Sequence, residues 1–126
     1  MSQSPDIEVV VLCSDLFFSS SIEGTASQHS VPCRVVGSID QLTETLAAGS
    51  VRRVIVDLEH PGLDVAAVVS LLPESSRPES SRPETFAFGP HVKVEQLKAA
   101  RAAGIDHVLP RSQFSERLPQ ILTGQF

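Results

Sequence analysis

The amino-acid sequence predicts a three-layer α/β fold in which helices cover both faces of a doubly wound, five-stranded parallel sheet. Short apolar runs alternate along the chain with segments whose apolar residues recur at helical spacing. This alternation is typical of strand–helix–strand units with right-handed crossovers, because parallel strands need a long connection that is usually a helix. The length of 126 residues fits one domain.

Five strands are expected, each a short run of apolar residues. The first run consists mostly of β-branched residues, which is typical of a parallel strand buried on both faces. Four further runs follow it along the chain. The expected strands are Val9–Cys13, Val31–Val36, Val54–Val56, Phe86–Phe88 and Val108–Leu109.

Five helices are expected after these strands, because apolar residues there lie three or four positions apart. Ser38 and Gln41 form a capping box at the start of the second helix, and Gly49 is expected to close it. The residues expected to face the core are, helix by helix, Phe18, Ile22 and Ala26; Ile39, Leu42 and Leu46; Val65, Val68, Val69 and Leu72; Val94, Leu97 and Ala100; and Phe114, Leu118, Ile121 and Leu122.

Proline, glycine and serine residues mark the bounds of the last three helices. Pro73 is expected to stop the third helix and Gly104 the fourth. Ser112 is expected to cap the fifth helix, and Pro119 to kink it. Residues 73–84 contain Glu-Ser-Ser-Arg-Pro twice and are expected to form an exposed, mobile loop, either a tolerated duplication or a docking epitope.

The composition counts against several classes of protein. The net charge of −5, the isoelectric point of about 5.2 and the absence of Trp and Tyr count against a nucleic-acid binder. Two cysteines are too few for a disulfide scaffold, and we expect Cys13 and Cys33, which lie in apolar runs, to be buried core thiols. The polar start and the short apolar runs argue against a secretory signal and a membrane span, so a cytoplasmic protein is expected.

Polar residues stand where the expected strands end. They are Ser14 and Asp15 after the first strand, Asp57, Glu59 and His60 after the third, Gly89, Pro90 and His91 after the fourth, and Pro110 and Arg111 after the fifth. Because the carboxyl ends of parallel strands meet at one edge of the sheet, where ligands bind, these residues are expected to converge around Asp57. Asp15 has a structural alternative as the N-cap of the first helix.

Two stretches resemble the receiver domains of two-component response regulators, including the single-domain chemotaxis regulators. Val54–Asp64 resembles the receiver pattern of an apolar strand, a phosphoacceptor Asp, a Pro four residues on and a second Asp seven residues on. Leu97–Asp106 is similar to the family's fourth helix and its alanine-glycine turn. The resemblance covers residues from Ile7 to about Leu122. It implies a CheY-like, flavodoxin-like sheet with strand order 2-1-3-4-5 in a single domain, residues 1–126.

The resemblance also implies roles for individual residues. Asp57 matches the phosphoacceptor. Asp15 matches one acid of the pair that holds Mg²⁺, with Asp57 and the backbone carbonyl of Glu59 as the other protein ligands. Arg111 stands near the family's phosphate-contacting lysine, which it does not replace like for like.

Other positions depart from the family's pattern. Ser14 stands in place of the second metal-binding acid, and Gly89 in place of the hydroxyl that carries the switch. Val108 stands in place of the aromatic residue of the fifth strand. These losses imply a degenerate receiver, or pseudo-receiver, that keeps its central aspartate and has lost most of its switch.

The sequence therefore predicts a stand-alone signalling module that acts by protein–protein interaction and is not an enzyme. The resemblance implies that its partner, an effector or a histidine kinase, binds the face from Val92 to Leu122, through which receivers also dimerise, so a homodimer is a further expectation. Residues 91–126 hold 5 basic and 3 acidic side chains, so this end of an acidic chain is mildly basic.

Two alternatives remain. One is a phosphoaccepting single-domain response regulator that uses Asp57 and Mg²⁺, with Arg111 in the place of the lysine. The other is a small metal- or ligand-binding flavodoxin-like domain in which His60 and His91 join the two aspartates at the edge of the sheet. His29 and His107 lie toward the opposite ends of their elements and indicate no site.

Overall fold

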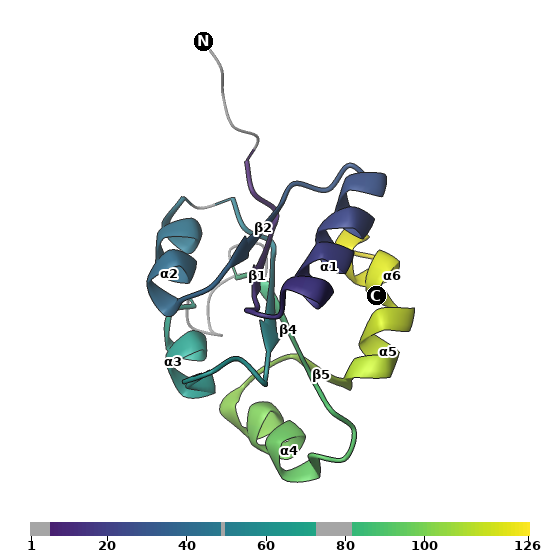
Figure 1. Ribbon diagram of the computed structural model, residues 1–126. Helices are drawn as coiled ribbons and strands as arrows, with labels where there is room; N and C mark the ends of the chain where they lie inside the picture. The colour runs from purple at the N-terminus through teal and green to yellow at the C-terminus, as the bar shows by residue number, and fades with distance from the viewer. Residues whose placement is uncertain (1–5, 49, 73–81) are drawn as a thin grey trace.

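The computed structural model describes residues 6–48, 50–72 and 82–126 (Figure 1). Its sheet has five strands in the order β2-β1-β3-β4-β5, and every neighbouring pair is parallel. The strands are β1 (Val9–Leu12), β2 (Cys33–Val36), β3 (Arg53–Asp57), β4 (Glu84–Gly89) and β5 (His107–Pro110). The predicted fold class and strand order are confirmed.

In the part of the chain that the structure describes, six helices flank the sheet: α1 (Leu16–Gln28), α2 (Ile39–Ala47), α3 (Val65–Ser70), α4 (Val94–Ala103), α5 (Arg111–Glu116) and α6 (Leu118–Thr123). Figure 1 shows α1, α5 and α6 on one side of the sheet and α2 and α3 on the other. The core residues of α4 belong to the same apolar layer as those of α2 and α3. Each face of the sheet is therefore closed by three helices, as the doubly wound pattern predicts.

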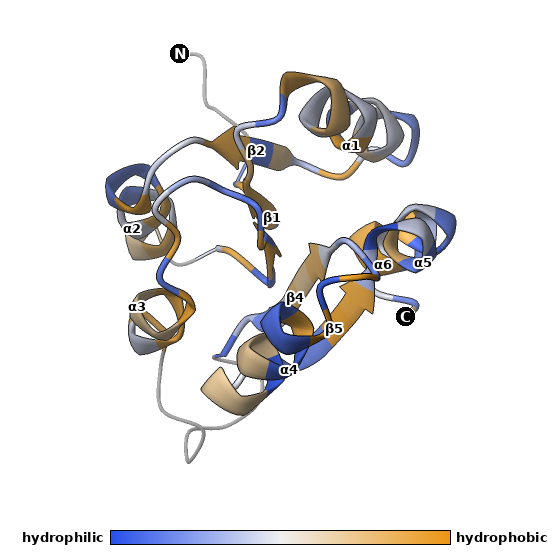
Figure 2. Ribbon diagram, turned by 60° about the horizontal axis from the view of Figure 1, so that its bottom comes forward, coloured by the Kyte–Doolittle hydropathy of each residue, from blue (hydrophilic) through white to orange (hydrophobic). Residues whose placement is uncertain are grey.

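Two apolar layers form the core, one on each face of the sheet (Figure 2). Alternate residues of the central strands point into opposite layers, so that Val10 lies in one and Val9 and Val11 in the other. Most residues expected to face the core are buried. Ile39 and Val94, at the first positions of α2 and α4, are exposed instead, because the first turn of each helix lies at the edge of the sheet.

The last helix differs from the prediction. A single helix capped by Ser112 and kinked at Pro119 was expected, whereas two short helices meet at Arg117. Pro119 lacks the N–H that would continue the first helix and is tolerated in the first turn of a new one. Ser112 lies inside α5, which begins directly after Pro110, so the expected serine cap is wrong.

The other predicted helix ends agree with the structure only in part, and α3 ends at Ser70, before Pro73. The Ser38 hydroxyl accepts a hydrogen bond from the Gln41 N–H, but the Gln41 side chain reaches back to the N–H of Gly37 and not to that of Ser38. Gly104 ends α4 in the left-handed conformation (φ 110°). Gly49, expected to close α2, lies outside the described residues.

The Glu-Ser-Ser-Arg-Pro repeat lies largely outside the described residues, so the structure does not test its predicted exposure. The expected loop does end earlier than residue 84. Pro83 is buried and Glu84 is the first residue of β4, paired in register with Arg53. The Glu84 carboxylate contacts Nε2 of His107 at 2.8 Å, which gives this histidine a structural role.

The two cysteines differ in burial. Cys13 is buried as expected, but Cys33 is only half-buried, because β2 is an edge strand of the sheet. Burial raises the pKa of both thiols to about 11, so neither is a reactive thiolate at neutral pH. Among the described residues, no helix has the length and apolar character needed to cross a membrane.

Candidate functional site

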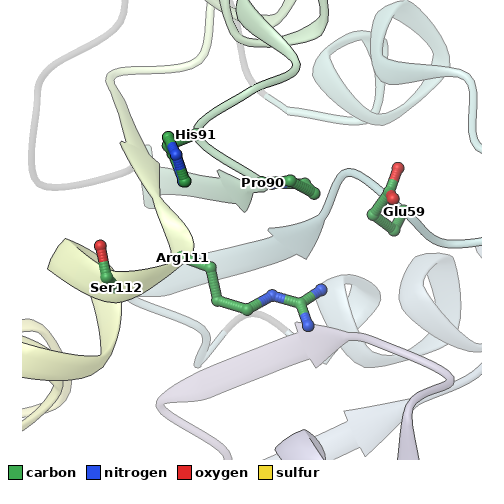
Figure 3. Close-up of a pocket in the computed structure, with 5 residues that line it drawn as sticks. All are labelled: Glu59, Pro90, His91, Arg111 and Ser112. Carbon is green, nitrogen blue, oxygen red and sulfur yellow. The ribbon is translucent and has the colours of Figure 1, made fainter.

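The carboxyl ends of β1, β3 and β5 bring Asp15, Asp57 and Arg111 together, as their positions after the strands predicted. The guanidinium of Arg111 lies between the two carboxylates, with Nη1 4.0 Å from Asp15 Oδ2 and Nη2 3.8 Å from Asp57 Oδ1. Figure 3 shows the Arg111 side chain extending along the edge of the sheet, away from Ser112. One cation therefore faces two acids that are far apart in the sequence.

Asp57 ends β3 and is only 2% exposed. Its Oδ1 accepts a hydrogen bond of 2.8 Å from the backbone N–H of Glu59, and its Oδ2 accepts one from the Cys13 thiol at 3.5 Å. A buried carboxylate needs such partners, because it has lost its hydration. Asp57 is thus held inside the fold by the backbone, a thiol and a guanidinium.

Asp15 performs the structural role that the sequence left open. It is the N-cap of α1, and its Oδ1 accepts hydrogen bonds from the N–H groups of Phe17 and Phe18 at 3.0 and 3.1 Å. Its second oxygen, Oδ2, is the atom that faces Arg111. The same side chain therefore caps the helix and contributes a negative charge to the site.

Two aromatic rings hold the Arg111 guanidinium. Its central carbon lies 5.1 Å from the centre of the Phe18 ring and 5.7 Å from that of Phe88, within the range of cation–π contacts. Phe88 in turn stacks on Phe114, with ring centres 4.5 Å apart. The sequence marked these phenylalanines as core residues but gave no sign that they line the arginine.

The Glu59 carboxylate is bonded to two residues at the start of α4. Lys93 donates to both of its oxygens at 3.0 Å, and the Gln96 amide donates to Oε2 at 3.1 Å. These hydrogen bonds, that from Gln96 foremost, lower the pKa of Glu59 below its usual value. The sequence did not reveal that Lys93 and Gln96 contact Glu59. Lys93 directly precedes α4 and Gln96 lies in it, and the orientation of this helix against the sheet does not follow from the sequence.

The space beside Gly89 is filled. A Cβ on this residue would lie 2.9 Å from Oε1 of Gln96 and 3.4 Å from the Leu58 side chain. Gln96 is held in this place by hydrogen bonds to the Leu58 carbonyl and to Glu59. A side chain at position 89 would therefore have to displace Gln96.

The two histidines of the edge lie in different hollows. His91 lines an open hollow of about 460 Å³ together with Glu59, Pro90, Arg111 and Ser112 (Figure 3). His60 lines another, of about 310 Å³, with residues of the loops that precede α2 and α3. Within residues 6–48, 50–72 and 82–126, no three His, Cys, Asp or Glu side chains are grouped so that they could hold a metal ion.

Large apolar side chains are exposed beside the site. Leu16 and Phe17, in the first turn of α1, are 81% and 90% exposed, and Val92 and Val94 before and in α4 are also exposed. Phe17 was not singled out from the sequence. Its place off the helical stripe of Phe18, Ile22 and Ala26, which faces the core, was the available signal that it is exposed. Exposed aromatic and aliphatic groups of this kind often mark a surface that another protein covers.

No family model matches this sequence, and comparison with curated protein sequences finds no match. Solved structures do match it. A response-regulator signal receiver domain from Bermanella marisrubri superposes with a TM-score of 0.72 at 16% identity, covering 90% of this chain and 96% of that one. The chain has the receiver-domain fold.

Two further receiver domains agree. One belongs to a sensor histidine kinase of Pseudomonas aeruginosa and holds a magnesium ion in its active-site cleft (TM-score 0.70, 12% identity, 94% of this chain and 99% of that one). The other, of a response regulator of Saccharomyces cerevisiae, was solved with its histidine phosphotransfer protein (TM-score 0.71, 13% identity, 98% and 94%). At sequence identities this low, the structural similarity shows the shared fold alone.

Proposed function

We propose that this protein is a receiver-fold signalling module that acts by binding a protein partner and does not switch by phosphorylation of Asp57. It acts on no external substrate. The proposal rests on three features at the carboxyl edge of the sheet: the burial of Asp57, the filled space beside Gly89 and the apolar residues exposed around the site.

The burial of Asp57 carries the proposal. A phosphoryl group can be transferred only to a carboxylate oxygen that a donor can approach in line. Both oxygens of Asp57 already accept hydrogen bonds, one of them also faces Arg111, and only 2% of the residue is exposed. A donor would have to displace the guanidinium from the rings of Phe18 and Phe88.

The surroundings of Gly89 support the same proposal. Glycine offers no hydroxyl to a phosphoryl group, and the neighbouring space is taken by Gln96 and Leu58. A switch needs an element with two arrangements whose balance the modification changes. Gln96 is bonded to the loop after β3, through the Leu58 carbonyl and the Glu59 carboxylate. Position 89 at the end of β4 has no hydroxyl that could follow a modification of Asp57.

The proposed partner surface is the face from Val92 to Leu122. Val92 is 72% exposed and lies beside Val94, Lys93 and the open hollow of His91 and Arg111. Because aliphatic side chains are exposed there, the face suits a protein partner that covers them with apolar side chains. A related fold, the yeast receiver domain, was solved bound to a phosphotransfer protein, which is consistent with a protein partner here.

Intact-mass measurement tests the absence of a switch. The protein is incubated with acetyl phosphate and Mg²⁺, and Asp57→Asn is treated in parallel. We expect no acid-stable, base-labile phosphoryl adduct on the wild-type chain. An adduct on the wild type that is missing from Asp57→Asn would overturn this part of the proposal.

Paired surface variants test the partner face. We expect a partner recovered with the wild-type chain to be lost with Val92→Asp and retained with Ile39→Asp. Ile39 is the matched control, because it is also an exposed aliphatic residue but lies on α2. Equal recovery with the two variants would show that the partner binds elsewhere.

One observation favours a phosphoaccepting receiver as the second candidate. The guanidinium of Arg111 already lies 3.8 Å from Asp57 Oδ1, a position from which it could contact a phosphoryl group on that residue. In that case Asp57 would be the acceptor and Mg²⁺ the metal. The adduct measurement separates the two candidates.

A further inference from the structure

The four carboxylate oxygens of the site all face partners within the protein. Asp15 Oδ1 accepts two backbone N–H groups, and Asp15 Oδ2 faces Arg111. Asp57 Oδ1 accepts the Glu59 N–H and faces Arg111, while Oδ2 accepts the Cys13 thiol. Mg²⁺ needs near-octahedral oxygen ligation and is usually held by one or two carboxylates together with water. These oxygens, as arranged, do not fit a divalent cation.

The guanidinium fills the place that such a cation would need. It lies within 4.0 Å of both carboxylates, and the rings of Phe18 and Phe88 lie against it. A guanidinium is weakly hydrated and stacks on aromatic rings, whereas Mg²⁺ keeps several waters. The aromatic walls therefore suit the arginine and not a hydrated metal ion.

The charges of the site lead to the same conclusion. Position 14, between Cys13 and Asp15, holds an exposed serine, so two aspartates contact one guanidinium, while the nearby Glu59 carboxylate is paired with Lys93. A divalent cation beside Arg111 would add two positive charges next to an existing one. Repulsion between them would weaken the binding of the metal.

We infer that Arg111 is the resident cation of this site and excludes divalent metals from Asp15 and Asp57. This inference deepens the proposed function, because a module without a phosphorylation switch has no need of a metal. It also makes a positive prediction: removal of the guanidinium opens a metal site that the wild-type chain lacks. The two carboxylates would then be free to take a cation that prefers oxygen ligands.

Titration with Mn²⁺, followed by electron paramagnetic resonance of the free ion, tests the inference. Mn²⁺ prefers oxygen ligands, as Mg²⁺ does. We expect Arg111→Gln to bind Mn²⁺ at least tenfold more tightly than the wild type, and Arg111→Gln/Asp15→Asn to lose that gain. Arg52→Gln is the matched control, because Arg52 is exposed and precedes the amino end of β3, whereas the site lies at the carboxyl end. It should bind as the wild type does.

Equal Mn²⁺ affinity of the wild type, Arg111→Gln and Arg52→Gln would overturn the inference. If Arg111→Gln does not fold alone, we expect Mn²⁺ to restore its far-ultraviolet circular dichroism, since the cation then neutralises the exposed pair of acids. A variant that Mn²⁺ neither binds nor refolds contradicts the inference.

The proposed function and the metal inference can fail separately. A wild-type chain that takes no phosphoryl group but binds Mn²⁺ as tightly as Arg111→Gln sinks the inference alone. A wild-type chain that is phosphorylated on Asp57 without added metal sinks the proposed function and leaves Arg111 as the resident cation.

Discussion

The contact between Arg111 and Asp57 should be measurable as a coupling in protein stability. Breaking a fully buried ion pair costs about 3–5 kcal/mol, whereas an exposed pair contributes about 0–1 kcal/mol. Asp57 is 2% exposed, but the Arg111 side chain is 36% exposed and its nearest nitrogen lies 3.8 Å from the carboxylate. We therefore expect Arg111→Met to lower the free energy of unfolding by about 2 kcal/mol, between the two limits.

A double-mutant cycle separates this pair from the other contacts of Arg111. Asp57→Asn keeps an oxygen for the Glu59 N–H and removes the charge together with the acceptor of the Cys13 thiol, a loss that is the same in both arms of the cycle. In that background, Arg111→Met should cost about 1 kcal/mol, because the contacts with Phe18 and Phe88 are still lost. The coupling energy is then about 1 kcal/mol.

Urea unfolding followed by far-ultraviolet circular dichroism suits this cycle, because the chain has no Trp or Tyr to report by fluorescence. Additive effects of the two substitutions, with a coupling below about 0.3 kcal/mol, would refute the reasoning that the two charges stabilise each other in the fold.

Three further predictions concern single positions. Gly89→Ser should displace Gln96 and lower the free energy of unfolding by about 1 kcal/mol, measured by the same urea titration; unchanged stability would show that the space is open. Because the pKa of Glu59 is lowered in the folded state, its carboxylate stabilises the fold at pH values above its unfolded pKa of about 4.3. This stabilisation is lost as the pH falls through the folded pKa. Lys93→Met should raise the midpoint of the Glu59 carboxyl carbon in an NMR titration; an unmoved midpoint contradicts the pairing. Cys13, with its pKa near 11, should react with iodoacetamide at pH 8 far more slowly than free cysteine, and equal rates would contradict its burial.

The fold could be predicted from the sequence because its two periodicities are clear. Short apolar runs rich in β-branched residues, such as Val9–Leu12, favour strands buried on both faces, and helical stripes such as that of Leu42 and Leu46 connect them. The errors fall where tertiary position decides. Cys33 is half-buried because its strand lies at an edge of the sheet, and α5 and α6 are separate because Pro119 falls in the first turn of a new helix.

The site was predictable only in part. The rule that parallel strands end at one edge placed Asp15, Asp57 and Arg111 together, and their contacts confirm it. The direction of each side chain was not predictable, because it depends on packing between elements. Glu59 contacts Lys93, which directly precedes α4, and two phenylalanine rings hold the arginine. No spacing in the sequence reveals these contacts.

The proposal that Asp57 drives no phosphorylation switch is tested most directly by amide NMR with beryllofluoride and Mg²⁺, a combination that mimics a phosphoryl group on an aspartate. Spectra of the wild-type chain are recorded before and after the addition. We predict that the signals of Asp57, Gly89 and residues 94–110 do not move. Shifts that start at Asp57 and extend through β4 into α4 and β5, and that are missing from Asp57→Asn, would contradict the account.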